Sequence, residues 1–208
     1  MVRLYRKATQ IVAVLCIPAS LLLAFFPREV LWAWTGDATA ASQAAPVLAL
    51  YALGNGVLAL SAMPYLLQFA SGKMRLHVIG GALVTMLLIP ALIWGTARYG
   101  ATGAAYAWLV SNLAYLMLWV PVIHRRFMPG QHMQWLASDI CIIAAPPMLA
   151  ATMLHAAVAL PENRLMLGLS LAAIGLLLMA LAAAASPYAR ETCGHLWRRQ
   201  VIGFARQG

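Results

Sequence analysis

The sequence predicts an all-α membrane protein with six transmembrane helices, and three observations support this fold class. The chain of 208 residues is 63% hydrophobic and only 9% charged, whereas soluble domains carry about 25% charged residues. Six long stretches contain no Asp, Glu, Lys or Arg, and the basic residues gather in alternate connections between them. So apolar a chain offers no solvated basic face, and we expect no nucleic-acid partner despite the net charge of +9.

Each uncharged stretch is long enough for one helix to cross a bilayer, which takes about 17–25 residues. The six predicted helices are 8–26, 44–70, 76–97, 101–123, 140–160 and 165–185. They define a transmembrane domain over 1–185, followed by a basic cytoplasmic tail over 186–208. The sixth helix is mostly Leu, Ala and Met, so we expect it at the periphery of the bundle, facing lipid.

The first helix has a rival interpretation as a secretory signal peptide, because Arg3, Arg6 and Lys7 precede its apolar run. The small-residue triplet at 38–40 also resembles a cleavage site. However, the run exceeds the usual signal-peptide core of about 7–15 residues, and the triplet lies well beyond the end of the run. We therefore expect this segment to remain as a transmembrane helix.

The connection 27–43 is predicted to lie on the membrane surface rather than to project into water, because it contains the amphipathic rings of Trp32 and Trp34. Tryptophan favours the headgroup zones at both membrane edges. Trp94 falls at the same predicted edge as these two, and Trp119 falls at the other. The aromatic residues therefore agree with the helix boundaries.

The distribution of charge predicts the topology. If the N-terminus is cytoplasmic, the inner connections and the tail hold 11 of the 14 basic residues and two of the five acids, one of which is Asp139. The net charge is then +9 on the inner side and 0 on the outer side. Basic residues favour cytoplasmic loops, so we expect a multi-pass protein of the inner (plasma) membrane with both termini in the cytoplasm.

Several chemistries lack their motifs in this sequence. No predicted helix holds a charged residue of the kind that relays protons or sodium, and no Gly-x-Ser-x-Gly nucleophile motif occurs. Gly72-Lys73 is not a phosphate loop, because the first glycine and the following Ser or Thr are missing. Cys16, Cys141 and Cys193 have no metal-ligand or redox spacing. We expect no catalytic residue, metal or cofactor, and no enzymatic activity.

Two of the predicted helices carry rows of polar and aromatic side chains. These are Ser61, Tyr65 and Gln68 in the second helix, with Asn55 two turns earlier, and Trp108, Asn112, Tyr115 and Trp119 in the fourth. Polar side chains in membrane helices often bond to neighbouring helices, and a lining for a hydroxyl-rich substrate would need the same residue types. Five of the six helices also contain proline, which gives either a kinked shape or a hinge.

Distinctive motifs follow one another along the chain. They are Pro18, "WTGD" (34–37), "YALGNGVLALSAMPYLLQFASGKMR" (51–75), Pro90, "RYGATGAAYAW" (98–108) and "HRR" (124–126). This order resembles the polysaccharide-export branch of the multidrug/oligosaccharidyl-lipid/polysaccharide (MOP) exporters, the Wzx-type flippases. The "YGATGAA" step and the Gln…Gly-Lys turn carry most of the resemblance, which covers about residues 5–160.

The resemblance implies a MATE-like helical fold and the transbilayer movement of an undecaprenyl-pyrophosphate-linked oligosaccharide for O-antigen (lipopolysaccharide), capsule or exopolysaccharide. Asn55, Gln68, Asn112 and Tyr115 are then expected to contact sugar hydroxyls. Lys73 and Arg75 are expected to meet the pyrophosphate, although basic residues in inner loops more commonly only determine topology. Membrane lipid, an amino-terminal half and a polysaccharide polymerase are the other expected partners.

The length of the chain departs from the family. Its members usually have twelve to fourteen helices in two lobes, and the start of this chain resembles the ninth helix of a fourteen-helix member. We therefore expect a carboxyl-terminal, partial bundle. The alternatives are another MOP exporter for drugs or the cell-wall lipid precursor, a non-transporting assembly subunit, and a membrane enzyme.

Overall fold

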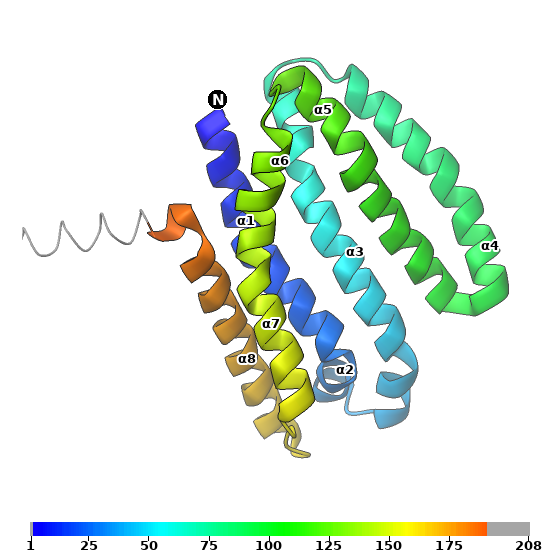
Figure 1. Ribbon diagram of the computed structural model, residues 1–208. Helices are drawn as coiled ribbons and strands as arrows, with labels where there is room; N and C mark the ends of the chain where they lie inside the picture. The colour runs from blue at the N-terminus through cyan, green and yellow to red at the C-terminus, as the bar shows by residue number, and fades with distance from the viewer. Residues whose placement is uncertain (1, 191–208) are drawn as a thin grey trace, which may run out of the picture.

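The computed structural model describes residues 2–190, and the regular elements in this range are helical (Figure 1). In chain order they are α1 (Val2–Phe25), α2 (Pro27–Thr35), α3 (Ala38–Ala70), α4 (Arg75–Ala114), the π-helix η1 (Tyr115–Trp119), α5 (Val120–Phe127), α6 (His132–Gln134), the π-helix η2 (Trp135–Cys141), α7 (Ile142–Ala157) and α8 (Arg164–Ala185). Most of the predicted basic tail lies outside the described residues.

Between residues 2 and 190, five helical segments are long and apolar enough to cross a membrane, which indicates an all-α membrane protein. They are Val2–Phe25, Ala38–Ala70, Arg75–Phe127, His132–Ala157 and Arg164–Ala185. The count differs from the predicted six because the third and fourth predicted helices form one helical segment of 53 residues. We call this segment, Arg75–Phe127, the hairpin.

The hairpin reverses direction at Gly100, so that its two arms, 75–99 and 101–127, run side by side (Figure 1). Gly100 has φ 60° and ψ −144°, a conformation that is accessible essentially to glycine alone. Close to this turn, Gly95 faces Gly103, and a Cβ atom on Gly95 would lie 2.8 Å from the Gly103 carbonyl oxygen. The "YGATGAA" step is therefore a tight helical reversal closed by backbone contact.

Helix α3 begins at Ala38 and not near residue 44 as predicted, because Asp37 caps it. The Asp37 carboxylate accepts hydrogen bonds from the backbone N–H groups of Thr39 (2.8 Å) and Ala40 (3.0 Å). This is the standard role of aspartate at a helix N-terminus. The predicted surface connection thus shrinks to α2, whose Trp34 side chain is exposed, and Gly36, which ends α2 with φ 74°.

The fifth predicted helix starts earlier than expected, at His132 instead of 140. Asp139, which the charge count assigned to an inner connection, therefore lies inside a helix and is completely buried. The prediction that no spanning segment holds a charged residue was wrong on this point. The helix continues through Asp139 because the carboxylate finds a cationic partner on α1, a contact that a single sequence does not reveal.

Helix α8 lies at one edge of the bundle (Figure 1), and its inward face is closely packed. It packs against α1 and α7 through a row of residues on one face. The row consists of Leu167, Leu171, Ile174, Leu178 and Ala182, and all five are buried. The hairpin forms the opposite edge, beyond α3 as seen from α8 (Figure 1).

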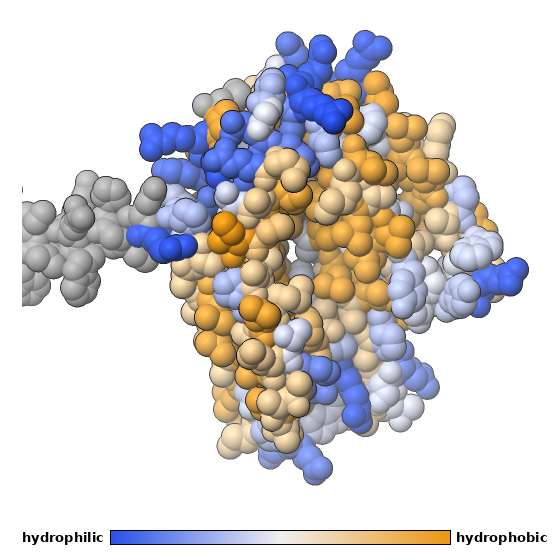
Figure 2. All heavy atoms as spheres, viewed as in Figure 1, coloured by the Kyte–Doolittle hydropathy of each residue, from blue (hydrophilic) through white to orange (hydrophobic). Residues whose placement is uncertain are grey.

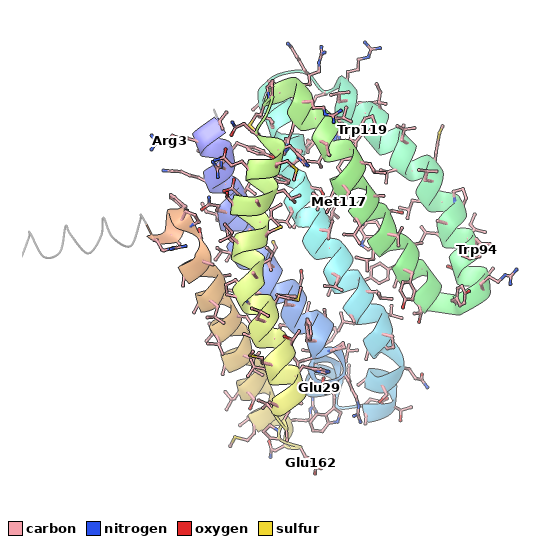
Figure 3. All side chains as sticks on the ribbon, in the orientation of Figure 1. Arg3, Glu29, Trp94, Met117, Trp119 and Glu162 are labelled. Carbon is pink, nitrogen blue, oxygen red and sulfur yellow. The ribbon has the colours of Figure 1, made fainter. Side chains whose placement is uncertain are left out.

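Hydrophilic residues gather at two opposite ends of the molecule and in a smaller patch at the right edge of the view, and apolar residues cover most of the surface between the two ends (Figure 2). Arg3 marks one end, near the N-terminus, and Glu29 and Glu162 mark the opposite end (Figure 3). We call these the Arg3 end and the Glu162 end. Trp119 lies in the half of the hairpin nearer the Arg3 end, and Trp94 lies nearer its turn.

Candidate functional site

The α3–α4 turn places two of the predicted binding residues at the Arg3 end. Helix α3 ends in a Schellman motif, in which the Lys73 N–H donates to the Gln68 carbonyl (3.2 Å) and the Gly72 N–H donates to the Phe69 carbonyl (3.0 Å). Gly72 adopts φ 68°, as this motif requires. The "SGKM" sequence therefore forms a sharp turn, after which Arg75 begins α4.

Lys73 and Arg75 line a pocket of about 610 Å³ together with Arg126 from the other arm of the hairpin. We call it the cationic pocket. Its remaining lining residues are Gly72, Met74, Leu76, Ile79 and Phe127, and none of the lining residues is acidic. All three cationic side chains are exposed. A pocket with several Lys and Arg side chains and no carboxylate is suited to binding a phosphate or diphosphate.

Arg126 was not among the predicted site residues, although the "HRR" motif contains it. The signal that identifies it is topological: a hairpin brings the two ends of a segment together, so residues 75 and 126 become neighbours despite their distance in sequence. The reversal at Gly100 is therefore what assembles the cationic pocket.

The polar residues predicted to contact sugar are not gathered in the cationic pocket. Asn55 of α3 is exposed and accepts a hydrogen bond of 3.1 Å from the Trp108 indole N–H. The Asn112 side chain donates to the Trp108 carbonyl at 2.8 Å. The first bond connects α3 to the second arm of the hairpin, as expected for interhelical polar contacts, whereas the second lies within that arm.

Gln68 and Tyr115 occupy two further environments. The Gln68 side chain is completely buried and donates to the Pro64 carbonyl at 3.2 Å. Its Oε1 atom has no hydrogen-bond partner among the described residues, and a buried acceptor without a partner carries a desolvation cost. Tyr115 lines an apolar groove between the hairpin arms. The six predicted residues therefore lie in four different environments.

A second polar cluster, buried near the Arg3 end, was not predicted. Its centre is Asp139 in η2, whose carboxylate accepts two hydrogen bonds from the Arg6 guanidinium, at 2.7 and 3.0 Å. A third bond of 2.7 Å comes from the Gln10 amide. The Gln10 carbonyl oxygen in turn accepts from the Ser186 hydroxyl and from the Tyr188 backbone N–H, both at 2.9 Å. We call this set the Asp139 network.

The Asp139 network connects three segments that are distant in sequence: α1, η2 and the chain just beyond α8. The carboxylate charge is compensated by Arg6, and both of its oxygen atoms are satisfied, which is the condition for keeping a carboxylate in an apolar bundle. The geometry indicates a structural role, because Arg6 and Gln10 together satisfy the hydrogen-bonding capacity of the carboxylate.

A row of aromatic and histidine side chains lies next to this network. The Tyr5 hydroxyl is 2.8 Å from His124 Nε2, and His124 Nδ1 is 2.9 Å from His132 Nδ1. The Trp135 indole N–H donates to the Thr9 hydroxyl at 3.0 Å. This row of side chains joins α5, at the end of the hairpin, to α1 and α6. Among residues 2–190, no group of three or more His, Cys, Asp or Glu side chains is placed to hold a metal ion.

Comparison with known proteins adds no relative. No protein-family model matches the chain, and neither do the curated proteins or the solved structures with which it was compared.

Proposed function

We propose that this chain is the carboxyl-terminal part of a flippase that translocates an undecaprenyl-pyrophosphate-linked oligosaccharide for O-antigen, capsule or exopolysaccharide biosynthesis. The observation that carries the proposal is the cationic pocket at one end of an apolar helical bundle. Lys73, Arg75 and Arg126 supply three positive charges where a membrane lipid would present its headgroup, and a diphosphate matches them in charge. The order of sequence motifs described above supports the same family.

In this proposal the Arg3 end faces the cytoplasm, where the carrier lipid is loaded. Its support is the excess of basic residues in the connections at that end. Each arm of the hairpin then crosses the membrane once, because the chain reverses at Gly100. The protein thus has six crossings and forms a partial MATE-like bundle, with alternating access by rocking of two helix bundles.

The four residues predicted to contact sugar have different roles in this proposal, because they lie in different environments. Asn55 is exposed and exchanges its bond to Trp108 for one to a sugar hydroxyl. Gln68 and Asn112 are buried, so they reach the sugar only after α3 and the hairpin move apart. Tyr115, on the groove between the arms, needs no such movement.

The test replaces Lys73 and Arg75 by glutamine, singly and together, in the intact protein and measures flipping of a labelled lipid-linked oligosaccharide in proteoliposomes. Each substitution removes a charge-assisted hydrogen bond of about 1.5–3 kcal/mol, so we expect a loss of about tenfold to a hundredfold for each residue. The matched control is Arg98→Gln, an exposed arginine beside the hairpin turn, which should flip at the wild-type rate. Unchanged flipping by the double variant at normal expression would exclude both residues from the mechanism.

A second candidate function is that of a non-transporting assembly subunit. The hairpin favours it, because only 6% of its most apolar stretch is buried within this chain, which leaves a long face for another membrane protein. Co-purification with an amino-terminal partner, together with flipping that is insensitive to Lys73 and Arg75, would favour this function over the first.

A further inference from the structure

The two arms of the hairpin enclose an apolar groove on the Arg3 side of their glycine contact. The groove has a volume of about 380 Å³ and is lined from the first arm by Gly80, Leu83 and Leu87, among others. The second arm contributes Ala114 and Leu118. Gly95 and Gly103 hold the arms together near the turn, and the groove lies between that contact and the Arg3 end.

The groove and the cationic pocket follow one another along the first arm. Ile79 lines the pocket, and the next residue, Gly80, lines the groove. Trp119 lies at the junction, where its ring contacts Gly80, since a side chain at residue 80 would clash with the indole. The indole N–H donates to the Leu76 carbonyl at 3.2 Å, so Trp119 stands in the position that an interfacial tryptophan takes between headgroups and chains.

A cationic pocket followed by an apolar groove matches an amphiphile with a phosphate headgroup. We propose that the hairpin binds one phosphate-bearing lipid, with the phosphate at Lys73, Arg75 and Arg126 and the first part of its single hydrocarbon chain in the groove between the arms. This inference rests on the proposed function and extends it, because it places the part of the lipid chain next to the phosphate within the protein and not in the bulk bilayer.

Two features select the occupant. Three cations without an acidic residue in the lining favour a headgroup with more than one negative charge, such as a diphosphate. A single groove between two arms accommodates one hydrocarbon chain, whereas the common anionic phospholipids have two or more acyl chains. The expected ligand class is therefore a polyprenyl diphosphate rather than a glycerophospholipid.

The experiment places the purified protein in nanodiscs of zwitterionic lipid. A polyprenyl diphosphate that carries a photoreactive group in its hydrocarbon chain is then added. After illumination, the labelled peptides are mapped. We expect most of the label on residues 80–119. In Ala114→Trp, whose new side chain fills the groove, labelling of this segment should fall about tenfold. The matched control Ala172→Trp, on the exposed face of α8, should label like the wild type.

Competition with unlabelled lipids distinguishes the contribution of the phosphate headgroup from that of the hydrocarbon chain. Unlabelled polyprenyl diphosphate should displace the probe, while the polyprenol without phosphate and phosphatidylglycerol should not. Arg126→Gln should weaken labelling several-fold without moving it to other residues. Label spread evenly over the hairpin and α8, labelling unaffected by Ala114→Trp, or equal competition by phosphatidylglycerol would each overturn the inference.

The labelling does not depend on transport. Loss of flipping activity with groove labelling retained would contradict the proposed function and leave the lipid site standing. Active flipping with evenly spread label would overturn the lipid site alone.

Discussion

The three-helix unit formed by α1, α7 and α8 and the hairpin Arg75–Phe127 are both long and apolar, but they are packed in different ways. About a third of the most apolar stretch of α1 is buried within the chain, compared with 6% for the hairpin. The unit is joined at the Arg3 end by the Asp139 network. The two arms of the hairpin are held together near the turn by two glycines, and the hairpin is held to α3 by one exposed hydrogen bond between Trp108 and Asn55.

The difference shows that hydropathy identifies helices in a membrane but does not decide which of them pack together. Lipid chains are as apolar as leucine, so close association depends on small residues, shape and polar contacts between helices. A buried carboxylate with its partners connects the three-helix unit, whereas the hairpin contains no carboxylate and is joined to α1 at its end by the buried contact between His124 and Tyr5. The four predictions below test this contrast, in order of decreasing effect.

Replacing Asp139 by alanine should have the largest effect. It leaves Arg6 and Gln10 without their buried acceptor, and removal of one partner of a buried pair costs about 3–5 kcal/mol. We expect the lower end of this range because 26% of the Arg6 side chain is exposed. Unfolding in mixed detergent micelles measures the change. The control Glu162→Gln, an exposed acid at the opposite end, should stay within about 0.5 kcal/mol.

Replacing Gly103 by alanine should separate the arms near the hairpin turn, because a Cβ atom there overlaps the Gly95 carbonyl. Overpacking of this kind costs about 1–3 kcal/mol. Disulfide cross-linking between cysteines introduced into the two arms should slow markedly. Gly81→Ala, on the same helix with open space at its Cβ position, is the matched control, and equal rates for both variants would contradict the glycine contact.

Replacing Ser186 by alanine should weaken the Asp139 network without breaking its ion pair. The hydroxyl donates to Gln10 at 2.9 Å, and losing such a bond costs about 1 kcal/mol. Hydrogen exchange just beyond α8 should increase. Ser170→Ala should have no such effect, because that hydroxyl bonds only to a carbonyl of its own helix, that of Met166.

Replacing Asn55 by alanine should have the smallest effect. The bond from Trp108 is exposed, and hydrogen bonds between membrane helices average about 0.6 kcal/mol. The same unfolding assay should detect a loss of this order, with Ser42→Ala as control, since its hydroxyl bonds within its own helix. A loss as large as that of Asp139→Ala would remove the contrast between the two regions.

The candidate site could be predicted only in part. Lys73 and Arg75 follow from the inner turn, because a Gly-Lys step after an apolar helix marks a helix end and a charged connection. Arg126 and the groove depend on the reversal at Gly100, which brings the ends of the hairpin together. Asn55 and Asn112 were predicted to lie on polar rows. The bond between Asn55 and Trp108 follows from how α3 and the hairpin meet, whereas the Asn112 bond lies within one helix.

The sequence by itself determined the all-helical, membrane-like character of the chain, because uninterrupted apolar stretches of about 20 residues satisfy their backbone polar groups only as helices in lipid. It also determined the tight turns at Gly72 and Gly100, since both need a conformation that favours glycine. The burial of Asp139, the packing of α8 and the exposure of the hairpin were decided by tertiary structure alone. Each depends on partners more than a hundred residues away or on neighbouring helices, and hydropathy is the same whether a leucine faces protein or lipid.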